Sequence, residues 1–273
     1  MTDGSGSRRR AVTLDLWHTL LHLEPKEEER YLREQEDRAA ALIATWPARP
    51  RAPGEAPPVD PWAAFRSEFR AAAVASQTGF SVPSTVQISV AAHNAGHEAR
   101  PLEYIQSLGD LVNGAAFRLA PGARELLERL RGSGYRIGLI SNTVGEPGRF
   151  LQRVCDRLGI GEFIEVWAWS DELPWTKPSP EIFRWCLAQL GVAPGDAVHV
   201  GDGASDVEGA LAARLRGVIL YEGLRDYSPE YRKMFAPPLS SDGRPSARVA
   251  YLADIPSALE EIFGSSSEHS PAR

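Results

Sequence analysis

Five polar side chains in this sequence stand beside short apolar runs, at positions where they could do chemistry. Asp15 follows "AVTL", Ser141 follows "IGLI", and Asp202 follows "VHVG", with Asp206 four residues further on. Lys177 precedes "PSPEIF", which begins like a helix with a proline and an acid. Carboxylate oxygens are the ligands that Mg²⁺ prefers, and an ammonium or a hydroxyl group donates hydrogen bonds to phosphate oxygens. Together these side chains would bind a divalent cation and a phosphate group.

Further polar residues lie at the ends of the same apolar runs. Asn142 follows Ser141, and Ser170 with Asp171 follows "VWAW". Lysine is rare in this chain, since only three of the 30 basic side chains are lysines, at positions 26, 177 and 233. A compact ammonium fits between a phosphate and a carboxylate better than a planar guanidinium does. The retention of a lysine at position 177 therefore favours a role in binding phosphate.

The elements that must position these residues are strands that alternate with helices. A short apolar run bounded by polar residues is typical of a strand buried on both faces. Such strands are predicted at residues 11–15, 135–141, 163–170, 197–202, 216–221 and from 249. Helices are predicted at residues 121–134, 147–160, 179–192, 204–215 and up to residue 263. Strands joined by helices pair in parallel through right-handed crossovers, so the predicted fold class is α/β with a doubly wound parallel sheet.

A mostly helical region separates the first strand from the others. Apolar residues at helical spacing predict helices at 25–46, 61–77 and about 84–98, with a proline-rich loop at 47–61. We expect residues 24–116 to form a helical cap inserted into a core of residues 11–23 and 117–263. Residues 1–10 are expected to be a disordered leader and residues 264–273 a disordered tail. The 222–248 segment is longer than an ordinary connection and is interpreted as an added lid or interaction loop.

The parallel sheet explains why the polar residues should meet. In such sheets ligands bind at the carboxyl ends of the strands, near the point where the strand order reverses. The candidate residues follow these strand ends or begin the next helix. We therefore expect the three carboxylates, a hydroxyl group and the lysine ammonium to converge on one crevice.

The ordered set of motifs is similar to that of a known family. The segments "DLWHT", "LISNT", "TKPSPEIF" and "GDGASDVEGA" resemble the four motifs of the haloacid dehalogenase (HAD) superfamily, over roughly residues 11–221. The helical insertion directly after the first motif resembles the cap of subfamily I. The resemblance implies a Rossmann-like core and a hydrolase, with Asp15 as the nucleophile that accepts a phosphoryl group.

The same resemblance implies roles for the other candidates. Ser141 and Asn142 would bind the phosphate, and Lys177 would steady both the phosphate and the nucleophile. Mg²⁺ would be held by Asp15, Asp202, Asp206 and the backbone carbonyl of Trp17. A carboxylate that attacks phosphorus needs its own charge and that of the phosphate neutralised, and Mg²⁺ and the lysine would do this.

One position departs from the pattern of the family's phosphatases. These enzymes have a second aspartate two residues after the nucleophile, which protonates the leaving oxygen and later activates water, and here that residue is Trp17. Loss of a general acid–base typically costs on the order of 10²–10⁴ in rate. His18 and His22 are the nearby candidates to replace it. The dehalogenase branch also lacks the second aspartate but needs no metal, so the presence of Asp202 and Asp206 speaks against it.

Three functions remain open at the level of the sequence. The favoured one is a Mg²⁺-dependent phosphatase that acts on a small phosphorylated metabolite through an aspartyl-phosphate intermediate. The alternatives are a weakly active or inactive scaffold that binds a phosphorylated ligand or a protein partner, and a dehalogenase-type hydrolase. The cap would set the substrate, and its arginines at positions 66, 70 and 100 are the candidates for substrate choice.

Composition narrows the classes of partner. The chain has 273 residues, 43% of them hydrophobic and 24% charged, which describes an ordinary globular protein. Its net charge of −6 provides no general attraction to nucleic acid or to an anionic membrane. Its two cysteines, Cys155 and Cys186, lie in apolar helical patterns, which predicts free thiols and a cytoplasmic location. The sequence gives no indication of oligomeric state.

Overall fold

The first apolar run forms an inner strand of a six-stranded sheet with the order β5-β4-β1-β6-β7-β8. In this computed structural model, which describes residues 9–229, 231–232 and 244–264, all neighbouring strands of that sheet are parallel. The strands are β1 (Ala11–Leu14), β4 (Arg136–Ser141), β5 (Val166–Trp169), β6 (Ala197–Gly201), β7 (Gly217–Tyr221) and β8 (Ala247–Val249). The predicted parallel α/β fold is therefore confirmed.

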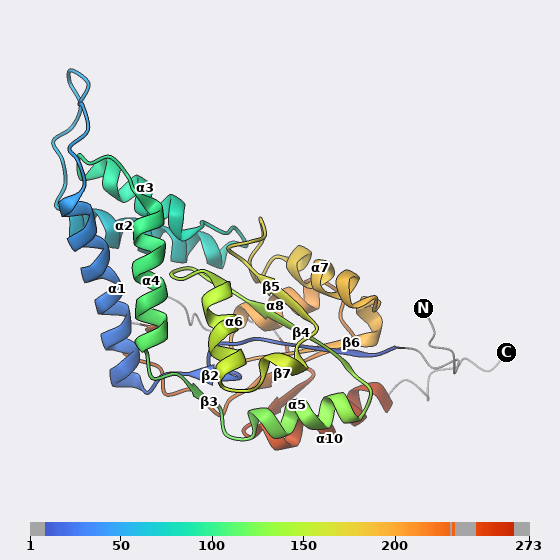
Figure 1. Cartoon of the computed structure of the whole chain (residues 1–273). Helices are drawn as coiled ribbons and strands as arrows, with labels where there is room; N and C mark the ends of the chain where they lie inside the picture. The colour runs from blue at the N-terminus through green and yellow to red at the C-terminus, as the bar shows by residue number, and fades with distance from the viewer. Residues whose placement is uncertain (1–8, 230, 233–243, 265–273) are drawn as a thin grey trace.

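Helices bury both faces of this sheet (Figure 1). On one face lie α5 (Ala123–Gly132), α6 (Gly148–Arg157) and α10 (Ile255–Gly264), and on the other α7 (Pro180–Leu190) and α8 (Ala204–Ala212). Val12 and Leu14 of β1 pack into the first of these layers, and Ala11 into the second. Successive strand residues point to opposite faces, so burial on both sides accounts for the unbroken apolar runs.

Four helices follow the first strand and stand together beside the sheet (Figure 1). They are α1 (Pro25–Thr45), α2 (Pro61–Gln77), α3 (Ser84–Asn94) and α4 (Pro101–Gly114). A helical cap after the first strand is thus confirmed, but the single predicted helix at 84–98 is wrong in its extent and α4 was not predicted. Gly96, with a φ of 82°, follows the end of α3, and Pro101 begins α4. A left-handed glycine and an N-terminal proline are the usual signals for these two boundaries.

A second, two-stranded sheet lies where the chain leaves and re-enters the core. It pairs β2 (Leu21–His22) with β3 (Arg118–Leu119) in antiparallel fashion. Two-residue strands have no readable periodicity, so the sequence did not predict them.

Several predictions fall on parts of the chain that the structure does not describe. Residues 1–8 of the expected leader and 265–273 of the expected tail lie outside the described residues, as do residue 230 and 233–243 of the 222–248 segment. Within the described parts, no helix is long and apolar enough to span a bilayer. Cys155 and Cys186 are both buried and free, as expected.

Candidate active site

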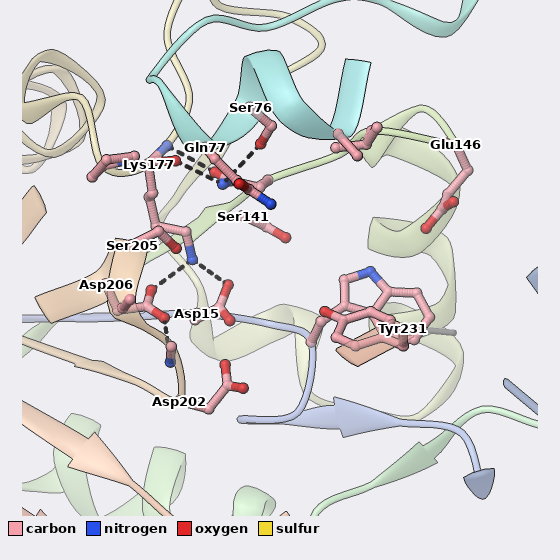
Figure 2. Close-up of a pocket in the computed structure, with 18 of the residues that line it drawn as sticks. Asp15, Ser76, Gln77, Ser141, Glu146, Lys177, Asp202, Ser205, Asp206 and Tyr231 are labelled. Atoms are coloured by element: carbon pink, nitrogen blue, oxygen red, sulfur yellow. Dashed lines mark hydrogen bonds and ion pairs between the residues drawn. The ribbon is translucent and has the colours of Figure 1, made fainter. Parts of the chain in front are cut away.

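Three carboxyl groups meet at the carboxyl edge of the sheet. Asp15, Asp202 and Asp206 each offer an oxygen, and these oxygens all lie within 4.8 Å of one another (Figure 2). Asp15 follows β1 and is fixed by its N–H, which donates to the Val200 carbonyl over 2.9 Å. Asp206 lies in the first turn of α8, and its Oδ2 accepts from the N–H of residue 203 over 3.0 Å. The structure therefore brings together the three predicted carboxylates.

A glycine at the end of β6 makes room for this arrangement. A Cβ atom at Gly201 would lie 2.2 Å from Cγ of Asp206, which is far inside van der Waals contact. Only a residue without a side chain therefore lets Asp206 fold back over the strand end.

Lys177 lies between two of the carboxylates. Its Nζ donates to Asp15 Oδ1 over 2.5 Å and to Asp206 Oδ1 over 2.7 Å, and the residue is buried. Burial alone would favour the neutral amine, but the two carboxylates raise the pKa of Lys177 above its ordinary value. Burial would also raise the pKa of Asp206, but the Lys177 ammonium and the His199 hydrogen bond lower it. Lys177 is therefore a fixed positive charge in this site.

His199, which the sequence analysis missed, supports Asp206 from behind. Its Nε2 lies 2.9 Å from Asp206 Oδ1, and its Nδ1 lies 2.9 Å from Thr13 Oγ1. All three residues are buried. The signal was present in the sequence, because a histidine inside the apolar run "VHVG" needs buried polar partners.

Ser141 and Asn142, adjacent at the end of β4, differ in what they bond. Ser141 Oγ is buried, lines the cavity that contains Asp15 and has no hydrogen-bond partner among the described residues. Asn142 instead exchanges two bonds with the backbone of Lys177, accepting from its N–H over 2.8 Å and donating to its carbonyl over 2.9 Å. Ser141 is thus available to a ligand, whereas Asn142 positions the lysine.

Ser170 and Asp171, which also follow a strand end, belong to a hydrogen-bond network outside the crevice. Asp171 Oδ1 accepts from Thr143 Oγ1 over 2.6 Å and from the Gly148 N–H over 3.1 Å. Ser170 Oγ accepts from the Thr143 N–H over 2.8 Å. These bonds fix the loop after β4, and neither residue lines the cavity.

The carboxylate cluster fits a divalent cation. Burial and the neighbouring charges of Asp15 and Asp206 raise the pKa of Asp202 well above its ordinary value, and burial also raises the pKa of Asp15. Lys177 alone does not offset three carboxylates, so a cation with hard oxygen preferences would relieve their repulsion. Trp17, whose carbonyl the resemblance adds to this ligand set, lines the same cavity.

The Trp17 ring belongs to an aromatic cluster at the edge of the cavity. Its centroid lies 5.4 Å from that of Phe117, 6.4 Å from that of Tyr31 and 6.5 Å from that of Tyr231. The ring therefore packs among other aromatic rings at this edge, and it offers no acid or base.

Neither histidine proposed as its replacement lines the cavity. His18 is buried with a φ of 55°, and its Nε2 lies 2.7 Å from Glu28 Oε1. His22 belongs to β2 and pairs with Arg118 of β3. The expectation that His18 or His22 replaces the missing aspartate is not supported by this geometry.

Glu146 is a second acid that the sequence analysis missed. It lines the cavity and is buried, on the side away from Lys177 in Figure 2. Burial raises the pKa of Glu146 to about 7, against opposing hydrogen-bonding contributions from Tyr31 and Trp17. Its segment "VGEP" has the composition of a turn, which gave no sign of burial.

Helices α1 and α2 form the wall of the cavity opposite the sheet. Their lining residues are Glu28, Tyr31, Leu32 and Gln35 from α1 and Phe69, Ala73, Ser76 and Gln77 from α2. The cavity that they close has a volume of about 140 Å³.

None of the three cap arginines lines this cavity, and their part in substrate choice stays a prediction. Arg66 Nη1 lies 3.6 Å from Glu36 Oε2 beside a separate surface hollow. Arg70 is exposed, and Arg100 pairs with Glu103 over 3.1 Å. Helical spacing alone did not reveal which face of α2 turns toward the sheet.

The described part of the 222–248 segment reaches the site. Tyr227 Oη donates to Asp202 Oδ2 over 2.5 Å, and Tyr231 lines the cavity. The Ser228 N–H donates over 2.9 Å to Glu28 Oε2, the same carboxylate that His18 contacts. This segment therefore joins the carboxylate cluster to the start of α1.

Comparison with known proteins gives a consistent result. Residues 9–214 match the haloacid dehalogenase-like hydrolase family. A phosphoglycolate phosphatase of Nitrosococcus oceani is 34% identical over 118 residues, 41% of this chain and 51% of that protein. A glyceraldehyde 3-phosphate phosphatase of Pyrococcus abyssi is 32% identical over 160 residues, 58% of this chain and 62% of that protein. The chain thus spans about half the length of the Nitrosococcus relative and somewhat more of the other.

A solved structure shares the fold over nearly the whole chain. The 2-haloacid dehalogenase of Pseudomonas syringae pv. tomato has a TM-score of 0.59 at 22% identity, covering 93% of this chain and 99% of that one. At this identity the likeness concerns the fold alone. Since the family match covers most of the sequence and the fold agrees with it, the chain belongs to the haloacid dehalogenase-like hydrolases.

Proposed function

We propose that this protein is a Mg²⁺-dependent phosphatase that transfers the phosphoryl group of a small phosphate monoester to Asp15 and then to water. The observation that carries the proposal is the buried ion pair between Lys177 and Asp15 beside three clustered carboxylates and the free Ser141 hydroxyl. The names of the two partial relatives, both phosphatases, support it. In this proposal residues 24–116 act as the cap, and residues 11–23 and 117–263 form the catalytic core.

The residues of the site would divide the reaction as follows. A carboxylate oxygen of Asp15 attacks phosphorus, the phosphorus bond to the ester oxygen breaks, and the leaving oxygen takes a proton. Water then attacks the aspartyl phosphate, loses a proton and releases phosphate, which regenerates the carboxylate. Lys177 holds Asp15 and the incoming phosphate oxygens, and the Ser141 hydroxyl donates to the phosphate.

The carboxylates would hold the metal. Asp15, Asp202, Asp206 and the backbone carbonyl of Trp17 are its proposed ligands. When bound, Mg²⁺ supplies a Lewis acid that offsets the charge of the phosphate and of the nucleophile. A dehalogenase needs no metal, so the use of Asp202 and Asp206 as metal ligands distinguishes the proposed phosphatase from a dehalogenase.

Trp17 predicts an unusual preference among substrates. No acid or base stands at that position, so the leaving oxygen receives no help from it. Aryl and acyl phosphates, whose leaving groups need little protonation, should react faster than alkyl phosphates. The same residue favours a second candidate function, a protein that binds a phosphorylated ligand and turns it over slowly.

The test is steady-state phosphate release from p-nitrophenyl phosphate and acetyl phosphate, with and without Mg²⁺. We expect Asp15→Asn, which keeps the shape of the side chain, to lower kcat by at least about 10³-fold. Acid-quenched mass spectrometry should detect a phosphoenzyme in the wild type and not in the variant. Full activity of Asp15→Asn would refute the mechanism, and halide release from 2-chloropropionate without metal would identify a dehalogenase. Binding of phosphate esters without turnover would favour the second candidate.

A further inference from the structure

The charged side chains that line the cavity are almost all acidic. Among the described lining residues the acids are Asp15, Glu28, Glu146, Asp202, Asp206 and Glu208, and Lys177 is the one base. The ammonium of Lys177 is already bonded to two carboxylates. The part of the cavity beyond the phosphate site therefore offers no described cation to a ligand.

This distribution disfavours a second anionic group on the substrate. A carboxylate placed near Glu146 would lose its hydration without gaining a positive partner, which is costly in a buried site. The cap arginines that could have supplied such a partner lie outside the cavity. An acid in the wall of a pocket is a repulsive element that discriminates between ligands of similar shape.

The wall also contains buried polar groups that need partners. Tyr31 and Gln35 are 4% and 1% exposed. The Tyr31 hydroxyl interacts with Glu146 and the Gln35 amide with Tyr104, but neither group has a partner in good hydrogen-bond geometry among the described residues. They are four residues apart on α1, which places them on the same helix face. A buried polar group left unpaired costs about 1–3 kcal/mol, so a hydroxyl group on a ligand would be favoured here. A hydroxyl both donates and accepts, so it can serve either group.

Part of the remaining surface is apolar and suits a carbon skeleton. Trp17, Leu32, Phe69, Ala73 and Val144 contribute to it. At about 140 Å³ the cavity admits a small ligand only.

From these observations we propose that the cavity selects small phosphate esters whose alcohol part is uncharged and carries a hydroxyl group, and rejects those with a second negative charge. Glu146 provides the rejection, and Tyr31 with Gln35 provides the recognition. This inference rests on the proposed function, whose site binds the phosphate end.

The experiment uses two substrates that differ in one group. Glycerol 3-phosphate and 3-phosphoglycerate share a three-carbon skeleton, with a CH₂OH group in one and a carboxylate in the other. We expect kcat/KM with Mg²⁺ to be at least tenfold higher for glycerol 3-phosphate. Equal kcat/KM values, or a preference for 3-phosphoglycerate, would overturn the inference. Turnover of p-nitrophenyl phosphate tests the proposed function separately, so the two failures can be told apart.

Variants assign the preference to residues. At about pH 8, above the raised pKa of Glu146 of about 7, the carboxyl group is ionised. Glu146→Gln then removes the charge without changing the shape, and should reduce the preference for glycerol 3-phosphate over 3-phosphoglycerate, the ratio of their kcat/KM values, by severalfold. Gln35→Ala should lower kcat/KM for glycerol 3-phosphate but not for propyl phosphate, which has no hydroxyl group to pair. Arg70→Ala, on the exposed side of α2, is the matched control and should leave the ratio unchanged. An unchanged ratio in Glu146→Gln and Gln35→Ala would contradict the assignment.

Binding tests the inference even if no ester is hydrolysed. Calorimetry with Asp15→Asn and Mg²⁺ should give a Kd at least tenfold lower for glycerol 3-phosphate than for 3-phosphoglycerate. Equal affinities, or no measurable binding of either compound, would refute the inference on its own.

Discussion

The folded structure opposes the ionisation of Glu146, and measurements of stability against pH can detect this. The pKa of Glu146 rises from 4.5 to about 7, mainly because burial disfavours the carboxylate. The folded state therefore binds this proton at pH values where the unfolded state has lost it. Ionising Glu146 therefore destabilises the folded state. This destabilisation is absent below pH 4.5, grows as the pH rises, and is complete above about pH 7.

The first prediction concerns this destabilisation. We compare the unfolding free energy of Glu146→Gln with that of the wild type. The variant should gain on the order of 3 kcal/mol relative to the wild type between pH 4.5 and pH 8. Urea unfolding at both pH values measures the change in unfolding free energy. A difference between the two proteins that does not vary with pH would mean that the carboxyl group titrates normally.

The second prediction concerns Trp17. Trp17→Asp places a carboxyl group two residues after Asp15 and should raise phosphate release from alkyl phosphates more than from aryl phosphates. It also removes a ring that packs against Phe117 and Tyr31, at a cost on the order of 3 kcal/mol. Trp17→Ala, which opens the same space without an acid, is the control. If the aspartate variant folds and shows no gain over the alanine variant, another group already transfers the proton.

At the scale of elements, the described part of the segment after β7 acts as a strap across the site. Here the strap means residues 222–229 with 231 and 232. Its Tyr227 bonds Asp202, its Ser228 bonds Glu28 of α1, and the rings of Tyr227 and Tyr231 both meet His18 edge-on, at 4.5 and 4.6 Å. The strap therefore links the carboxylate cluster at the sheet edge to the first cap helix.

The third prediction tests the strap through its contact with Asp202. Tyr227→Phe removes a hydrogen bond to Oδ2 that fixes the carboxylate, and should weaken Mg²⁺ binding about tenfold, as loss of such supporting contacts does. Calorimetric titration of Mg²⁺ measures the Kd without any need for turnover. Tyr251→Phe, at an exposed tyrosine, serves as the control. Equal Kd values in Tyr227→Phe and the wild type would show that the hydroxyl does not orient Asp202.

The elements also show where sequence reasoning worked and where it failed. The core strands were predictable because both of their faces are buried, and the polar residues at their ends lie at one sheet edge for that reason. The cavity wall was not predictable, because Gln35 and Glu146 look like solvent-facing residues in a helix and a turn. Their burial arises from contact between segments distant in the sequence. Position at a strand end does not by itself distinguish a site residue, because Asp171 at the end of β5 fixes a loop instead.

At the scale of the whole molecule, the site opposes the stability of the fold when no cation is bound. Three carboxylates, of which Asp15 and Asp206 are buried and Asp202 is half-buried, share one small volume with a single lysine. Any ligand that binds the folded state alone shifts the equilibrium toward it. The free energy of unfolding should therefore depend on Mg²⁺ concentration.

The fourth prediction is the size of this dependence. Mg²⁺ at about 100 times its Kd should raise the Tm by roughly 5 °C or more. Differential scanning calorimetry with and without Mg²⁺ checks it, and Ca²⁺ provides a comparison of ion size. Asp202→Asn, with a similar shape and one charge fewer, should lose most of the shift. A Tm that Mg²⁺ leaves unchanged in the wild type would count against the proposed metal site.

The position of β1 inside the sheet also governs how the molecule can be made. Thr13 of β1 bonds His199 of β6, and these residues are 186 positions apart in the chain. A ribosome that adds about 5–20 residues per second needs roughly 10–40 s to cover that interval. During this time the helices of the cap can pack on one another, whereas β1 has one edge without its partner strand. Asp15 thus leaves the ribosome well before β6, and the carboxylate cluster can form only after β6 has been made.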